Sequence, residues 1–286
     1  MSRARSPRTP RRKTATAAGL VAVSAAVAAV LAWPASAGSA ANGPSRTAHV
    51  SGSGPATSSS LPTTANGHAL VAAAPAAKGG RVLWTPHITA GRSAFPDVQC
   101  SGGTFGVVSD RVKGKVWRAR QPGGRERCEA VGPKLKLGST FFLGWSSKVD
   151  IRDSKNRYVF QLKCSPSTGT ANHPLELDAT NGRIRLQAWT HKHAAVPLWT
   201  ARVKNGTWHS YALKIHEGRK DGTVEFWFDG VKQRFTNGST RYTGTTYDGT
   251  SDYLKWGSYH PSPRDAVNWF TSPRMATTLA AATARS

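Results

Sequence analysis

The feature that most constrains the fold of this chain is a series of short runs in which apolar and polar residues alternate. Gly, Asn, Asp or Pro closes each run, and no segment shows a long helical period. Such alternation is typical of strands that bury one face and expose the other. Two turn signals, Asn181-Gly182 and Asp229-Gly230, favour antiparallel hairpins. We therefore expect an all-β sandwich of antiparallel strands. The runs are GKVWRARQ, STFFLGWSSKVD, RYVFQLKC, HPLELDA, GRIRLQAW, WHSYALKIH, GTVEFWFDG and YLKWGSYH.

Residues 1–37 have the composition of a secretory signal peptide. Six basic residues precede the apolar run Ala17–Trp33, and Ala35-Ser36-Ala37 matches a small-residue cleavage site. The alternative is an uncleaved membrane anchor, which the shortness of the run disfavours. We expect a secreted, extracellular protein with no membrane attachment after cleavage. The Arg11-Arg12 pair leaves both general and twin-arginine export open.

The rest of the chain divides by composition into three parts. Residues 38–80 are rich in Ala, Gly, Ser, Thr and Pro without an aromatic residue, which predicts a disordered linker. Every tryptophan except Trp33 follows residue 80, so we predict one domain at 81–274, large enough to bury a core. Residues 275–286 are predicted to be a flexible tail, with a short terminal helix as the alternative.

The charge balance indicates a polyanionic partner. The chain has 39 basic and 15 acidic residues, a net charge of +24. Without the signal peptide, 33 basic residues remain against the same 15 acidic ones, which leaves +18. A field of this strength attracts nucleic acid or an acidic polysaccharide, and composition does not separate the two.

Three cysteines, Cys100, Cys128 and Cys164, allow one disulfide and one remaining thiol in a secreted chain. All three pairings stay open. No Cys/His cluster has metal-ligand spacing, so we predict no metal site and no cofactor. A structural calcium ion is compatible with a jelly roll, but no ligand cluster in the sequence argues for one.

The stretch YLKWGSYH (Tyr253–His260) alternates in an unusual way. Leu254 and Trp256 point to one side of the expected strand, and Tyr253, Lys255 and Tyr259 to the other. The apolar pair suits a core. The second side presents two phenols and an ammonium group, separated by Gly257, which leaves both an ordinary solvated face and a functional surface open.

Two motifs carry a resemblance to known folds and enzymes. The segment WHSYALKIHEGRKDGTVEFWFDGVKQ (Trp208–Gln233) resembles concanavalin-type jelly rolls. The pattern Y-x-K-x-G-x-Y (Tyr253–Tyr259) resembles jelly-roll polysaccharide lyases of the alginate, glucuronan and heparin lyase I types. The resemblance implies a concanavalin-like β-jelly roll in which Tyr259 is catalytic and Lys255 contacts substrate.

Further segments extend the resemblance in the expected order. WRARQPGGRERCE (Trp117–Glu129) resembles the arginine strand of these lyases, and FQLK (Phe160–Lys163) resembles their Q-x-H strand with lysine in place of histidine. The following loop resembles the heparin and glucuronan lyase side of the group. The implied catalytic residues are Tyr259, Gln161, His173 and Lys163, and the implied substrate-binding residues are Lys255, Arg118, Arg120, Asn172, Tyr253 and Arg127.

The chemistry of a lyase explains these residue types. β-Elimination removes the C5 proton of a uronate, and neutralising the adjacent carboxylate lowers the barrier. Gln161 suits that neutralising role, and Tyr259 suits base, acid or both. A tyrosine base needs nearby positive charge to lower its pKa. Lys163, Lys255, Arg118 and Arg120 are the candidates for that charge.

Other assignments follow from strand spacing and intrinsic acidity. Lys255 lies about 13 Å along the strand from Tyr259, so we assign it to a neighbouring carboxylate unless a bulge at Gly257 shortens the distance. Gly257 itself is expected to leave room for a sugar ring. His173 is the alternative base, because imidazole titrates near neutral pH.

We therefore predict a secreted polysaccharide lyase, a monomer that acts on an acidic polysaccharide and not on nucleic acid. The alternative is a non-catalytic, lectin-like or laminin-G-like module that binds polyanionic glycans. A jelly-roll glycoside hydrolase is disfavoured, because Glu176 and Asp178 are not followed by the second glutamate that a catalytic carboxylate pair requires.

Overall fold

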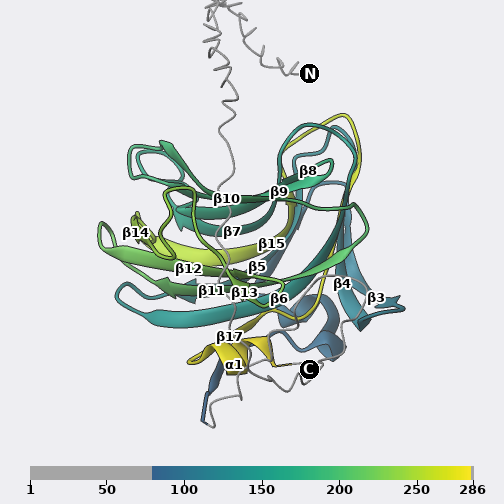
Figure 1. Cartoon of the computed structure of the whole chain (residues 1–286). Helices are drawn as coiled ribbons and strands as arrows, with labels where there is room; N and C mark the ends of the chain where they lie inside the picture. The colour runs from purple at the N-terminus through teal and green to yellow at the C-terminus, as the bar shows by residue number, and fades with distance from the viewer. Residues whose placement is uncertain (1–78, 285–286) are drawn as a thin grey trace, which may run out of the picture. The chain divides into compact units, whose positions relative to one another are not determined.

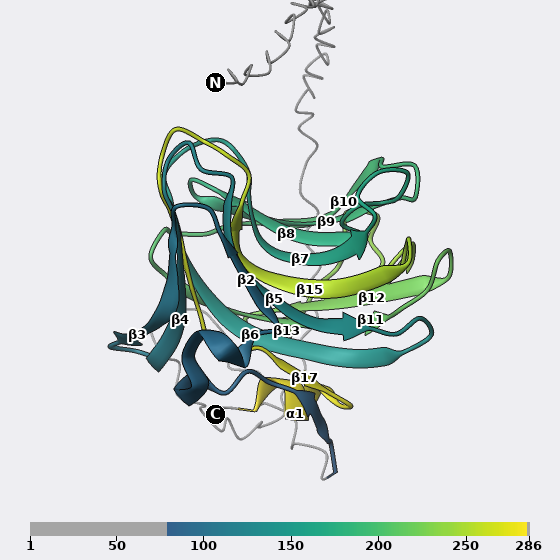
Figure 2. The ribbon, with the colours of Figure 1, turned by 180° about the vertical axis from the view of Figure 1, so that it is seen from behind.

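The computed structural model describes residues 79–284, which form two antiparallel sheets packed face to face (Figures 1 and 2). The predicted signal peptide and all but the last two residues of the predicted linker lie outside the described residues. Every strand pair is antiparallel. The prediction of an all-β jelly-roll sandwich is confirmed.

The larger sheet contains ten strands and lies below the other sheet in Figure 1. Its main order is β13-β12-β11-β6-β16-β4-β3, with β14 beside β12 and β17 between β6 and β1. The strands are β1 Val82–Trp84, β3 Thr104–Asp110, β4 Gly114–Gln121, β6 Thr140–Ile151, β11 Trp208–His216, β12 Gly222–Phe228, β13 Val231–Lys232, β14 Tyr242–Gly244, β16 Ala266–Phe270 and β17 Arg274–Ala276.

The smaller sheet contains seven strands in the order β10-β9-β8-β7-β15-β5-β2. In Figures 1 and 2 it bows, with loops rising at both of its ends on the side away from the larger sheet. The strands are β2 Asp97–Cys100, β5 Arg127–Leu135, β7 Arg157–Ser165, β8 Leu175–Thr180, β9 Arg183–Trp189, β10 Ala195–Arg202 and β15 Ser251–Tyr259.

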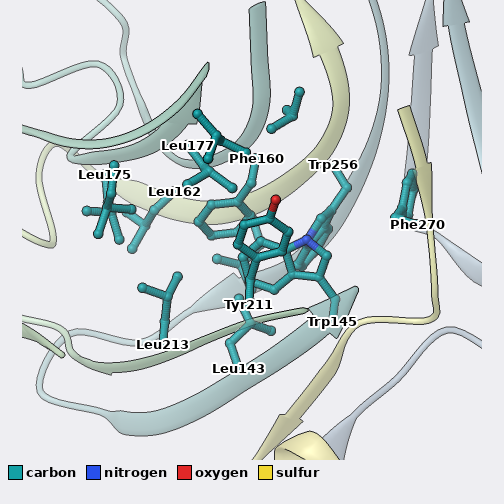
Figure 3. Close-up of a cluster of buried hydrophobic side chains, with 14 of the residues drawn as sticks. Leu143, Trp145, Phe160, Leu162, Leu175, Leu177, Tyr211, Leu213, Trp256 and Phe270 are labelled. Atoms are coloured by element: carbon teal, nitrogen blue, oxygen red, sulfur yellow. The ribbon is translucent and has the colours of Figure 1, made fainter. Parts of the chain in front are cut away.

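The core lies between the sheets and is built by the inward half of each alternating run. Leu254 and Trp256 of β15 are fully buried there, as the alternation predicts. Figure 3 shows the two layers meeting, with rings from both sheets in contact. The labelled core residues are Leu143, Trp145, Tyr211, Leu213 and Phe270 from the larger sheet, and Phe160, Leu162, Leu175, Leu177 and Trp256 from the smaller.

Both predicted hairpins are present. Asn181-Gly182 joins β8 to β9, and Asp229-Gly230 joins β12 to β13. Asp229 and Gly230 have φ angles of 49° and 80°, a conformation that explains the Asp-Gly sequence.

The C-terminal segment differs from the predicted flexible tail. Strand β17 pairs with β1 and β6, and a five-residue helix α1 (Leu279–Thr283) follows it, as in the alternative considered from sequence. Thr278 caps the helix, accepting a bond from the Ala281 amide. Ala282 is buried against β6, where a Cβ on Gly144 would lie 2.4 Å from its carbonyl oxygen. Docking therefore orders a helix that is too short to be stable alone.

Cys100 of β2 forms a disulfide with Cys128 of β5, and Cys164 is a buried free thiol. The disulfide thus links two neighbouring strands of the smaller sheet. A 3₁₀ helix (Ile88–Ala94) completes the fold. No helix within residues 79–284 is long and apolar enough to cross a membrane.

Gly257 has a structural role that differs from the predicted one. A Cβ at this position would lie 2.1 Å from the Cys128 carbonyl oxygen on β5, and its φ is 152°. β15 also bulges here. Trp256 pairs with Phe160 and Tyr259 pairs with Tyr158 of β7, so two residues of β15, Gly257 and Ser258, lie opposite one residue of β7. Glycine is thus required for the close approach of two strands rather than for a sugar ring.

We expect Gly257→Ala to lower the free energy of unfolding by about 1–3 kcal/mol, because the added carbon overlaps backbone atoms. Urea denaturation of the full chain measures the change. Gly106→Ala on β3 is the matched control, since a Cβ there meets nothing within 4 Å, and it should change stability by less than about 0.5 kcal/mol. Equal effects of the two substitutions would contradict the role assigned to Gly257.

Candidate active site

The outer face of the smaller sheet carries Tyr259 at the end of β15. Arg127 of β5 and Tyr158 of β7 are its direct partners across the two neighbouring strands. The Arg127 guanidinium lies 4.6 Å from the centre of the Tyr259 ring. The Tyr158 ring is 5.8 Å away on the other side. Three adjacent strands therefore place a cation and two phenols together.

His260 follows Tyr259 and is held in an unusual conformation. Its φ is 90°, a left-handed value rare outside glycine. The His260 amide donates to the Glu126 carbonyl, and its own carbonyl accepts bonds from Gln121 and Arg157. The exposed imidazole lies 4.9 Å from the Tyr259 ring and 4.7 Å from the Tyr158 ring. Surrounding bonds thus fix a strained residue beside the phenol, as is common at functional sites.

Rings continue from Tyr158 across the sheet. His173 lies 5.0 Å from Tyr158 and 4.9 Å from Trp189 of β9, and Trp189 stacks on His193 at 4.6 Å. The rings form a band from β15 to β9, in which Tyr158 and His173 are buried and Tyr259, Trp189 and His193 reach the surface. Faces of this type suit carbohydrate, because flat rings pack against the C–H faces of sugars.

A buried polar network lies beside Tyr259 on the same face. The Lys255 ammonium donates to one Glu129 carboxylate oxygen at 2.7 Å, and the Gln161 amide donates to the other at 2.5 Å. All three side chains are at most 1% exposed. They come from β15, β5 and β7, so the network ties together the strands that hold Tyr259, Arg127 and Tyr158.

Burial sets the protonation states of the two residues at the end of β15. It raises the pKa of Tyr259 above 10.0, and the nearby Arg127 only partly offsets the rise. Burial, with positive charge from Arg157, lowers the pKa of His260 below 6.5. Near neutral pH the phenol is therefore protonated and the imidazole uncharged.

His173 and Glu176 form a second buried pair, 3.1 Å apart between Nε2 and Oε2. Burial lowers the pKa of His173 to about 3 and raises the pKa of Glu176 to about 8. Both groups are thus uncharged over most of the neutral range. His173 is only 4% exposed, so its catalytic role stays a prediction.

The remaining predicted residues on this face lie near the same strands. Lys163 of β7 donates to Asn172 at 2.5 Å and to Ser167 at 2.9 Å, and burial lowers its pKa. Tyr253 of β15 pairs with Lys163 across the strands. The structure therefore brings Tyr253, Lys163 and Asn172 together on one side of the buried network, and their contacts with substrate stay predictions.

Two predicted substrate-binding residues lie in the other sheet, and a third is buried. Arg118 and Arg120 are on β4, with their side chains on the outer face of the larger sheet. The chain changes sheets between Gln121 and Arg127, so these two arginines are in a different sheet from Tyr259. They supply no charge to Tyr259. Lys255 is on the predicted face, but it is buried against Glu129 and does not present its ammonium group to substrate.

Sequence reasoning missed His260, Tyr158, Trp189 and His193. His260 directly follows the lyase-like motif, so its position was the one available signal. Tyr158 and Trp189 give no such signal, because both look like ordinary strand aromatics. Within residues 79–284 no group of three or more His, Cys, Asp or Glu side chains is arranged to hold a metal ion.

We expect Lys255→Met to lower the free energy of unfolding by about 3–5 kcal/mol, since it leaves Glu129 buried without its cation. Urea denaturation should show that Lys255→Met/Glu129→Gln recovers much of this loss. Lys214→Met is the control, because its pairing with Glu225 is exposed and should contribute less than about 1 kcal/mol. If the loss of stability in the double variant equalled the sum of the losses in the two single variants, Lys255 and Glu129 would not be energetically coupled.

The Glu176 pKa predicts a pH-dependent difference in stability. The folded chain holds this proton more tightly than the unfolded chain, whose carboxyl titrates near 4.5. The resulting stabilisation is complete below pH 4.5 and is lost as the pH rises through about 8. Glu176→Gln cannot ionise, so its Tm should rise relative to the parent's over this range.

Glu225→Gln provides the control for that measurement. The pKa of Glu225 is lowered, because hydrogen bonds and charge from Lys232 and Lys214 outweigh burial. The contribution of Glu225 to the stability of the folded state is complete above pH 4.5. The Tm difference between Glu225→Gln and the parent should therefore stay constant from about pH 5 to about pH 9. A constant difference for Glu176→Gln as well would contradict a raised pKa.

Comparison with known proteins agrees with this architecture. The chain resembles the endo-β-1,4-glucuronan lyase of the fungus Trichoderma reesei, with 19% identity and a TM-score of 0.52 over 66% of this chain and 93% of that chain. It also resembles alginate lyase vAL-1 from Chlorella virus, with 11% identity and a TM-score of 0.51 over 69% of this chain and all of that chain. At these identities the likeness establishes the shared fold.

A search of curated proteins finds no significant match. The sequence profile of the family described as polysaccharide lyase, however, matches residues 89–276. That segment is more than half of the chain and includes Arg127, Tyr158, Tyr259 and His260. The chain therefore belongs to the polysaccharide lyase family.

Proposed function

We propose that this protein is secreted and cleaves a uronic acid-containing polysaccharide by β-elimination on the outer face of the smaller sheet. One observation carries the proposal: a protonated phenol, an uncharged imidazole and a guanidinium group converge at Tyr259, His260 and Arg127. These are the three kinds of group that an elimination beside a carboxylate requires.

Arg127 is the proposed neutraliser of the substrate carboxylate. Its side chain is 25% exposed, contacts the Tyr259 ring and is ion-paired with Glu126 and, at 3.8 Å, with Glu129, so a substrate carboxylate would have to compete with Glu126 for it. A guanidinium paired with the uronate stabilises the enolate-like intermediate that forms when C5 loses its proton. The sequence predicts Gln161 for this role. Gln161 is buried and its amide donates a hydrogen bond to Glu129, so in this arrangement it stabilises the outer face of the smaller sheet from beneath the surface.

His260 and Tyr259 have opposite proposed roles in proton transfer. The uncharged, exposed imidazole accepts the C5 proton, and the C5–H electrons form the C4–C5 double bond. The C4–O bond breaks, and the Tyr259 phenol donates its proton to the leaving oxygen. Two titratable groups whose environments push their pKa values apart are suited to such a division. His173 and Lys163 remain the alternative bases.

Charge and structural likeness support an acidic substrate. The chain carries 39 basic residues against 15 acidic ones. The two similar structures with TM-scores above 0.5 are named as lyases of glucuronan and of alginate. We therefore propose a polyuronate, and we expect uncharged glycans to be poor substrates because they cannot use Arg127.

We expect the full chain to release products with a C4–C5 double bond, detected by ultraviolet absorbance, from at least one of glucuronan, heparin, heparan sulfate and alginate. Tyr259→Phe should lower kcat at least a hundredfold while polymer binding persists, because it removes the proton donor. His260→Gln should have a loss of similar size. Tyr242→Phe, at a half-buried phenol of the larger sheet, is the control and should retain activity.

The pH profile separates the two roles. kcat should rise with pH as His260 loses its proton and fall only at high pH as Tyr259 ionises. An active His260→Gln variant would refute the assignment of the base but not the lyase. Binding of these polymers without any unsaturated product would refute the proposed catalysis and favour the non-catalytic glycan-binding module.

A further inference from the structure

The outer face of the larger sheet carries a second ordered set of aromatic and basic side chains, on the side of the sandwich opposite Tyr259. Trp208 of β11, Lys148 of β6, Trp269 of β16 and Arg118 of β4 are successive cross-strand partners. We call these four residues the outer row. With strands about 4.8 Å apart, the row is about 14 Å long.

The outer row is held in place by its own contacts. The Lys148 ammonium lies 5.2 Å from the Trp208 ring and 4.9 Å from the Trp269 ring, between the two indoles. Asp110 accepts bonds from Lys148 at 2.5 Å and from the Trp208 indole N–H at 3.1 Å. Because these groups fix one another, the two indoles are set in a defined geometry before any ligand arrives.

Cations without acidic partners surround the outer row. Lys148 is neutralised by Asp110, but Arg118, Lys113 and Arg264 form no ion pair with any acidic side chain among residues 79–284. Lys113 lies 6.0 Å from the Trp208 ring. The local excess of positive charge is therefore available to an anionic ligand.

A cavity of about 540 Å³ opens beside Trp269. Its lining also includes Lys148, Asp150, Arg152, Arg264, Asn181 and Asn205. The Oδ1 atom of Asn205 is buried without a hydrogen-bond partner within the described chain, while its Nδ2 donates to the Ile151 carbonyl. The cavity therefore combines an indole wall with amide and cationic side chains, and its one carboxylate, Asp150, is paired with Arg152, a mixture that suits a ligand with hydroxyl and carboxylate groups.

We propose that the outer row and this cavity form a non-catalytic binding site for the acidic polysaccharide, on the face opposite the active site. The indoles of Trp208 and Trp269 pack against sugar rings, and Arg118 and Arg264 pair with carboxylates. The identity of the ligand rests on the proposed function. Such a site holds a long polymer near the enzyme and raises its effective concentration at Tyr259.

The test measures binding and activity separately in the full chain. Glucuronan is the probe, in affinity electrophoresis and in the ultraviolet assay. We expect Trp208→Ala/Trp269→Ala to weaken glucuronan binding at least fivefold and to slow cleavage of long glucuronan. Cleavage of a glucuronan tetrasaccharide, too short to reach both faces, should change less than twofold.

Matched variants isolate the outer row. Arg118→Gln should weaken glucuronan binding, whereas Arg120→Gln should not, because Arg120 lies two residues along the same face but is paired with Asp265. Trp227→Ala, on the same face outside the row, should behave like the parent. Arg118→Gln removes no buried group, so it tests the site even where the double tryptophan variant fails to fold.

Unchanged glucuronan binding in Arg118→Gln and in a folded double variant would overturn the proposal. An equal loss in Arg120→Gln would also overturn it, since general charge would then explain binding. Tighter binding of single-stranded DNA than of glucuronan, lost with the outer row, would reassign the surface to nucleic acid. If no polymer is cleaved but the outer-row variants still lose binding, the proposed catalysis fails and this site stands.

Discussion

The buried ion pair between Lys255 and Glu129 is the contact on which the outer face of the smaller sheet depends. Removing two charges from water is costly, and the cost is offset only when geometry and hydrogen bonding are good. Here the carboxylate accepts from Lys255 on one oxygen and from Gln161 on the other. A shift of β15 by one residue would separate the charges, so the network specifies the register of three strands.

That register decides which groups meet at the end of β15. Arg127 lies two residues before Glu129 on β5, and Tyr259 lies four residues after Lys255 on β15. The bulge at Gly257 and Ser258 absorbs one residue, which aligns Tyr259 with Tyr158. The reactive arrangement is therefore set by a charge pair and a glycine that do not themselves reach the surface.

The two faces of the sandwich use charge differently. On the smaller sheet, burial favours the uncharged forms of His173, Glu176, Tyr259 and His260 near neutral pH, and Arg127 is paired with Glu126. On the outer face of the larger sheet, Lys148 lies between two tryptophans and is paired with Asp110, whereas Arg118, Lys113 and Arg264 form no ion pair within residues 79–284.

The fold was predictable because alternation and turn residues are local signals. Leu254, Trp256 and both hairpins lie where those signals predict. The site was only partly predictable, because its contacts are not local. Lys255 looked exposed since its partner Glu129 is 126 residues away. Pro122-Gly123-Gly124 marks a break between Arg118 and Arg127, but no local signal tells which sheet the following strand joins. The short terminal helix was only the alternative to a flexible tail, because its order depends on docking against β6.

Cys128 stands between Arg127 and Glu129, with its side chain on the opposite face of β5. Its disulfide to Cys100 therefore fixes the position of Cys128. This residue lies between Arg127, whose guanidinium group reaches the surface, and Glu129, whose carboxylate is buried. Disulfides of this kind persist in oxidising surroundings and are rare where thiols are kept reduced. The strand that carries Arg127 is thus cross-linked by a covalent bond whose survival depends on redox conditions, which makes formation of the candidate site a question of chemical environment as well as of folding.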